Sequence, residues 1–222
     1  MNPLSIVDII VVPAIIVAIA FAVRGSQRPR LDRVTAWLDG GWAPVVLGAI
    51  TALTILFVWG SLNQVGVIHD ERAYVLQARL FASGRWSAPS PPYPEFFEQM
   101  LVLVVPRLAA KYPPGHSLLL VPGVWLGLTG LVPVLLGGLT GGLVFALARR
   151  ASNAWVAVLT WLLCTTASDG LRWRASYFSE TTTAAALLVA WWALLEWRRT
   201  KRASMLVVGA LGPAGGLEVG AD

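Results

Sequence analysis

The chain has 222 residues, of which 56% are hydrophobic and 13% are charged, and its mean hydropathy is +0.67. Soluble domains carry about 25% charged residues, so this composition excludes an ordinary soluble domain and predicts an integral membrane protein. The net charge of +5 does not call for nucleic acid as a partner, because the basic residues follow the ends of apolar segments. A single cysteine, Cys164, excludes an intramolecular disulfide.

Five apolar segments are long enough, or nearly so, to cross a bilayer as helices, which takes ~20 residues. They are Leu4–Val23, Trp42–Gly60, Gly130–Ala148, Ala154–Leu171 and Thr181–Trp197. The first is interpreted as an uncleaved helix, because it lacks a basic leader and a small-residue cleavage site. The predicted fold class is therefore an all-α integral membrane protein, with about five transmembrane helices and a large extracytoplasmic loop that contains interfacial helices.

The basic residues follow alternate segments, which fixes the expected orientation. They are Arg24, Arg28, Arg30, Arg33, Arg149, Arg150, Arg198, Arg199, Lys201 and Arg202. By the positive-inside rule all of them are cytoplasmic if the N-terminus is outside. Asp70-Glu71 and Ser179-Glu180 then share the extracytoplasmic side.

The apolar segment His116–Leu128 would reverse part of this arrangement if it crossed the membrane. At about thirteen residues it is too short for a comfortable span, and Pro122 and Gly123 interrupt it. We expect a helix that lies in the outer interface or dips partway into the membrane.

The extracytoplasmic loop 61–129 is too long for a simple connector. Apolar residues at helical spacing predict a helix over Ala73–Ala82 along the membrane surface, which Gly84 can end. The Pro-rich segment Ala88–Pro94 is expected to be extended. Met100–Leu108 fits either a short strand or an interfacial helix.

Adjacent carboxylates at a membrane boundary, Asp70 and Glu71, are the main clue to function. One of them can act as a general base toward an acceptor hydroxyl or amine. Together they can bind a divalent cation, although two ligands fall short of a full oxygen shell. A third interpretation is purely structural: they are solvated, or they pair with Arg72 and Lys111.

The other candidate residues also have two interpretations each. Lys111 and Arg72 can hold a phosphate at the membrane surface, or simply extend to the interface. His116 can be a ligand or proton relay, or an interfacial hydrogen-bonding residue. Glu180 can belong to the site, or can stabilise a helix N-terminus after Ser179.

In order along the chain, these residues resemble a known family. The pattern is Asp70-Glu71 with Tyr74, a Lys111-Tyr112-Pro-Pro-Gly turn, a basic pair at the end of a later helix, and Ser179-Glu180 at the start of another. It is similar to the lipid-linked-sugar glycosyltransferases of the GT-C fold, in particular the protein O-mannosyltransferase and aminoarabinose-transferase group. The resemblance covers roughly residues 60–202.

The resemblance implies a polyprenyl-phosphate sugar donor and a glycan, lipid or protein acceptor, at the outer face of a bacterial cytoplasmic membrane. Asp70 would be the general base, and Glu71 would support the acceptor or a cation. Lys111 would contact the donor phosphate, and Glu180 would belong to a second outer loop of the site. Tyr74, His116 and Arg72 are the further substrate-binding candidates, although Arg72 stands one position earlier than the arginine of that pattern.

Three parts of the chain are expected. Residues 1–41 form an accessory membrane helix and a basic cytoplasmic loop, and residues 42–202 form the GT-C-like core. Residues 203–222 form a truncated helix and a disordered tail, as in a truncated or frame-shifted reading frame. Such a chain is a glycosyltransferase or its N-terminal fragment. The alternative is a non-catalytic membrane scaffold that binds another protein through Pro89–Pro94 and Phe96-Phe97.

Overall fold

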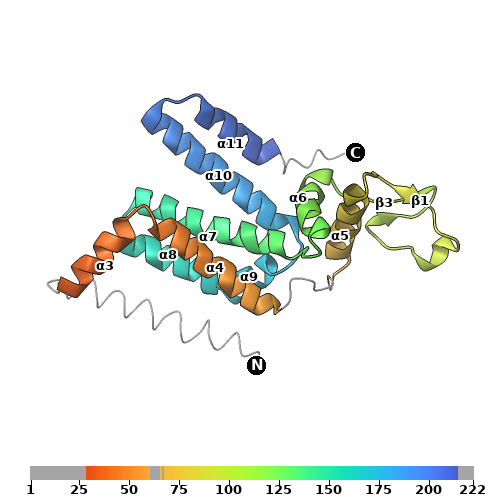
Figure 1. The fold of residues 1–222 in the computed structure, drawn as a ribbon, viewed down its shortest axis with the longest axis horizontal. Helices are drawn as coiled ribbons and strands as arrows, with labels where there is room; N and C mark the ends of the chain where they lie inside the picture. The colour runs from red at the N-terminus through yellow and green to blue at the C-terminus, as the bar shows by residue number, and fades with distance from the viewer. Residues whose placement is uncertain (1–28, 61–65, 67, 215–222) are drawn as a thin grey trace.

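The computed structural model describes residues 29–60, 66 and 68–214. The expected helix Leu4–Val23 and the last eight residues of the tail lie outside these described residues. The described part has two regions placed end to end: long helices, which we call the bundle, and short helices with strands, which we call the cap (Figure 1).

The bundle contains α3 (Pro29–Asp39), α4 (Ala43–Trp59), α7 (Leu131–Ala151), α8 (Ala154–Thr166), α10 (Ser179–Thr200) and α11 (Ser204–Ala214). The cap contains α5 (His69–Ala82), β1 (Ala88–Pro89), a 3-10 turn η2 (Pro94–Phe96), β2 (Val102–Leu103), β3 (Arg107–Ala110) and α6 (Pro114–Trp125). A short helix, α9 (Ser168–Arg174), connects α8 to α10 beside the cap.

The predicted helical class is confirmed, with one addition and one correction. The addition is a small antiparallel sheet of order β1-β3-β2. Of the two structures predicted for Met100–Leu108, residues 102–103 and 107–108 therefore adopt the strand. The correction concerns residues 154–171, where a single continuous helix was the wrong prediction. Ala167, with φ −57° and ψ 117°, leaves the helical region and separates α8 from α9.

By length and composition, one helix of the described residues, α7, suits a membrane crossing by itself. A second does so if residues 32–39 of α3 and all of α4, bent by 88°, count as one broken span. The apolar α8 has 13 residues, a rise of about 20 Å against a hydrocarbon core of about 30 Å. The expectation of about five spans therefore stays a prediction.

Helices α4 and α7 pack with their backbones in close approach. A Cβ atom added at Gly48 would lie 2.8 Å from the carbonyl oxygen of Gly138, and one at Gly142 would lie 2.7 Å from that of Pro44. Real Cβ atoms do not come so close to a backbone oxygen. Small residues thus allow this contact, as they do in helix pairs within membranes.

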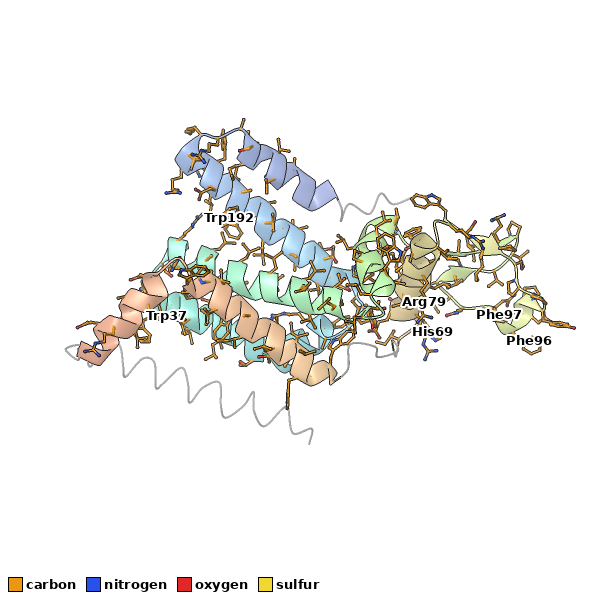
Figure 2. All side chains as sticks on the ribbon, viewed as in Figure 1. Trp37, His69, Arg79, Phe96, Phe97 and Trp192 are labelled. Carbon is orange, nitrogen blue, oxygen red and sulfur yellow. The ribbon has the colours of Figure 1, made fainter. Side chains whose placement is uncertain are left out.

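Basic residues gather at the end of the bundle opposite the cap. Arg149, in the last turn of α7, donates to the carbonyls of Leu38 and Gly40, which end α3. Arg150 pairs with Glu196 of α10 at 2.8 Å. Trp192 extends from α10 in the same area (Figure 2), and the Arg150 guanidinium lies 5.8 Å from its ring centre. This placement agrees with the charge pattern of the sequence.

The cap joins the bundle through a hydrophobic cluster. Ile55 and Trp59 at the end of α4 pack with Tyr74 of α5, Leu120 of α6 and Tyr177. A second cluster, formed by Ala73, Val102 and Val104, attaches the sheet to α5. These contacts place one face of α5 against the ends of the bundle helices, where the candidate residues lie.

Candidate functional site

Helix α5 carries the candidate carboxylates in its first turn. Asp70, Tyr74 and Gln77 follow a spacing of four and then three residues, which places them on one helix face. Asp70 is half-buried, whereas Tyr74 and Gln77 are buried. The face points toward α6, the end of β3 and the start of α10.

Glu71 is buried, with 6% of its surface exposed, and its carboxylate accepts two backbone hydrogen bonds. Oε2 accepts from the N–H of Ile68 at 3.2 Å, which is a capping interaction at the start of α5. Oε1 accepts from the N–H of Tyr177 at 3.0 Å, in the connection between α9 and α10. These contacts favour a structural use of this carboxylate.

Asp70 has a different environment, because its partner is a phenol. Burial, a hydrogen bond with Asp70, and the nearby charges of Asp70, Tyr74 and Glu180 raise the pKa of the Tyr112 hydroxyl well above its usual range. Tyr112 therefore stays protonated and donates its proton to the Asp70 carboxylate.

Tyr112 is held in place by the same face of α5. Its ring stacks on that of Tyr74, with centroids 4.2 Å apart and planes 21° from parallel. Its carbonyl oxygen accepts from Gln77 Nε2 at 2.8 Å. Ser117 of α6 completes this network by donating to Gln77 Oε1 at 2.7 Å and lies 3.2 Å from the Tyr74 carbonyl.

His116, in the first turn of α6, lies behind these residues with 5% of its surface exposed. Nε2 lies 2.8 Å from the carbonyl oxygen of Tyr177, and Nδ1 lies 2.7 Å from Thr182 Oγ1. Burial lowers the pKa of the imidazole below its usual value, although the Tyr177 carbonyl opposes this. Both ring nitrogens are thus occupied by protein groups, which favours the hydrogen-bonding interpretation over a ligand role.

Glu180 and Ser179 open α10 on the far side of the site. Ser179 is the first residue of that helix, and its hydroxyl accepts from the Tyr74 hydroxyl at 3.0 Å. Glu180 is exposed in the first turn, a position where the helix dipole stabilises a carboxylate. Its charge also acts on Tyr112, whose pKa the Asp70 carboxylate raises as well.

Two of the candidate cations extend away from Asp70. Lys111 is exposed, and Nζ donates to the carbonyl of Met100 at 3.0 Å. With Glu98 and residues 99–100 and 102–105 it lines a cavity of about 490 Å³ beside the sheet. Arg72 is also exposed, and its Nε donates to the carbonyl of Gly66 at 2.9 Å.

The structure therefore groups Asp70, Glu71, Tyr74, His116 and Glu180, and directs the side chains of Lys111 and Arg72 elsewhere. The predicted site residues did not include those that connect this group, which are Gln77, Tyr112, Ser117, Tyr177 and Thr182. For Gln77 the signal is its place one turn beyond Tyr74, and for Tyr112 it is the motif beside Lys111. Tyr177 is joined through its backbone, which leaves no signal in the sequence.

No group of three or more His, Cys, Asp or Glu residues suited to a metal ion occurs in the described part of the chain. Comparisons of this protein with family models, with curated proteins and with solved structures find no match.

Proposed function

We propose that this protein is a membrane-embedded glycosyltransferase, or the N-terminal part of one, which uses Asp70 as general base and a polyprenyl-phosphate sugar as donor. The observation that carries this proposal is the half-buried Asp70, which shares a hydrogen bond with Tyr112 near the charge of Glu180. The sequence resemblance supplies the class of donor, and the geometry supplies a carboxylate suited to take a proton.

In the proposed step, Asp70 removes the proton of an acceptor hydroxyl or amine while the acceptor atom bonds to the anomeric carbon. The bond from that carbon to the phosphate oxygen breaks, and its electrons leave with the polyprenyl phosphate. Since phosphate is a good leaving group once its charge is stabilised, one base suffices. Tyr112 would orient the Asp70 carboxylate through their hydrogen bond.

The proposed donor site is the cavity beside Lys111. The ammonium group of Lys111 is exposed there and donates to a backbone carbonyl, which a phosphate oxygen can replace. Lys111 and Tyr112 follow the end of β3 at Ala110. Because Lys111 extends away from Asp70, a donor bound there would have to reach past Tyr112 to bring its anomeric carbon to the base.

The proposed location is the cytoplasmic membrane of a bacterium, with the N-terminus and the cap outside. Large apolar side chains on the bundle support a lipid environment, because Leu53, Phe57, Leu135 and Leu187 are 64%, 87%, 60% and 59% exposed. The arginines at the end opposite the cap support the orientation.

The test is sugar transfer by the protein reconstituted in vesicles with radiolabelled undecaprenyl-phosphate sugars. Asp70→Asn is expected to lower transfer at least about 100-fold, the usual contribution of a general base. Glu95→Gln removes an exposed carboxylate of the cap and is expected to transfer at the wild-type rate. Normal transfer by a correctly inserted Asp70→Asn variant would show that Asp70 is not the base.

A second candidate, a non-catalytic scaffold, is favoured by one observation. Phe96 and Phe97 are 81% and 49% exposed at the end of the cap farthest from the bundle (Figure 2). Large exposed apolar side chains of this kind often mark a protein-binding surface. Absence of transfer and of undecaprenyl-phosphate binding, together with a partner lost in Phe96→Ser, would favour the scaffold over the enzyme.

A further inference from the structure

The connection between α9 and α10 is held by side chains that act on a single residue, Tyr177. Its N–H donates to Glu71 Oε1 at 3.0 Å, and its carbonyl lies 2.8 Å from His116 Nε2. Glu71 comes from α5 and His116 from α6, so two helices of the cap hold both polar groups of one backbone residue.

The chemistry of these contacts assigns the proton positions of His116. A carbonyl oxygen only accepts, so Nε2 carries the hydrogen and donates it to Tyr177. In a neutral ring Nδ1 is then an acceptor, and the hydroxyl of Thr182 donates to it at 2.7 Å. Thr182 is 4% exposed, so this chain of bonds is closed to solvent.

The ring of Tyr177 is fixed as firmly as its backbone. It contacts the ring of Trp59 edge-on, with centroids 4.9 Å apart, and is 2% exposed. Helix α10 begins two residues later, at Ser179, whose hydroxyl accepts from Tyr74. The start of α10 is therefore determined by bonds from α5 and α6.

We propose that Glu71 and His116 are positioning residues, which hold the backbone of Tyr177 and thereby place Ser179 beside Tyr74 and Glu180 near the Asp70–Tyr112 pair. The inference rests on the proposed function for its effect on catalysis, but the hold on Tyr177 is a property of the folded chain. It gives the adjacent carboxylates separate roles: Asp70 faces the substrate, and Glu71 holds the protein.

Two neighbouring threonines of α10 provide a matched test. Thr182→Val removes the hydroxyl that donates to His116, at nearly constant volume. Thr183→Val removes an exposed hydroxyl that bonds only to the carbonyl of Ser179, one turn back in the same helix. The first readout is amide hydrogen exchange over residues 175–180 in the full chain in vesicles, and it needs no activity.

Exchange at the Tyr177 amide is expected to become at least about tenfold faster in Thr182→Val and to stay unchanged in Thr183→Val. Glu71→Gln, which keeps one acceptor oxygen, is a second variant and is expected to behave like Thr182→Val. Equal exchange at this amide in wild type, Thr182→Val and Glu71→Gln would overturn the proposal.

The second readout separates positioning from general loss of structure. In a transfer assay Thr182→Val is expected to lower kcat several-fold with the donor KM unchanged, because the donor cavity lies at Lys111. A rise in KM with unchanged kcat would overturn the assigned role. If wild type transfers no sugar but the exchange results hold, the proposed function fails while the hold on Tyr177 stands.

Discussion

In the bundle, α4 and α7 approach until Gly48 meets the backbone of Gly138, whereas in the cap α5 and α6 are joined by buried polar side chains. The buried faces of the bundle are mostly apolar, and the ion pairs that Glu196 forms with Arg150 and Arg199 lie at the end opposite the cap. In the cap Glu71, Gln77, His116 and Ser117 are all buried.

The difference follows from what each region has to do. Close backbone packing needs only small residues and stabilises helices in lipid, where polar groups are costly. Buried polar networks contribute less net stability, but they specify one arrangement of side chains, because each unsatisfied group is costly. In the proposed enzyme the bundle would serve as support, and the cap would hold groups at defined positions.

The largest expected effect is in the bundle. Gly48→Ala would place a Cβ atom 2.8 Å from the carbonyl oxygen of Gly138, which a backbone atom cannot easily avoid. We expect a loss of about 1–3 kcal/mol in the free energy of unfolding, as for other overpacked cores. Gly41→Ala, where the added atom meets nothing within 4 Å, is the control. Equal unfolding midpoints in detergent for the two variants would contradict the packing account.

A smaller effect is expected in the cap. Ser117→Ala removes the hydroxyl that donates to Gln77 and leaves the amide oxygen of a buried side chain without this partner. We expect a loss of about 1–2 kcal/mol in the free energy of unfolding. Ser152→Ala, which removes an exposed hydroxyl bonded one turn back to Ala148, is the control. Equal free energies of unfolding for the two variants would mean that the hydrogen bond from Ser117 to Gln77 does not contribute to stability.

The pH dependence of stability should separate the two histidines. Because burial lowers the pKa of His116, the unfolded chain binds a proton more readily than the native protein, so stability falls as pH drops below about 6.5. This acid loss, measured as the Tm difference between about pH 7.5 and about pH 5.5, should shrink in His116→Gln. The exposed His69 is the control, since His69→Gln should keep the wild-type difference. If His116→Gln showed the same Tm difference between the two pH values as the wild type, groups other than His116 would be responsible for the acid loss.

The smallest effect is expected at the far end of the bundle. Arg199 pairs with Glu196 at 2.6 Å, but its side chain is 75% exposed. Exposed pairs add little to stability because water and salt screen them. Arg199→Met should therefore leave the unfolding midpoint within experimental error at physiological salt. A clear fall in Tm would place this pair among the stabilising contacts.

The sequence predicts the bundle better than the cap. Long apolar runs indicate α4, α7 and α10 directly, and helical spacing indicates α5. The strands have two to four residues each, too few for a periodic signal. The break at Ala167 falls among Thr165, Thr166, Ser168 and Asp169, a short polar interruption that was included in one predicted helix.

For the site, the sequence indicates several of the residues but not which contacts each of them makes. The motif order indicates Asp70, Tyr74 and Glu180, which the structure brings together around Tyr112. The use of Glu71 depends on the N–H of Tyr177, more than a hundred positions away. Such a long-range backbone contact forms only when three helices have packed, so adjacent carboxylates look equivalent in the sequence.

The central claim is that Asp70 and Glu71 have separate roles, and the most direct test compares their amide variants in one preparation. For Asp70→Asn and Glu71→Gln, both the unfolding midpoint and the rate of sugar transfer in vesicles are measured. We predict that Asp70→Asn keeps the wild-type Tm and loses transfer at least about 100-fold, while Glu71→Gln lowers the Tm and keeps transfer within about tenfold. The reverse pattern, or the same pattern in both variants, would contradict the account.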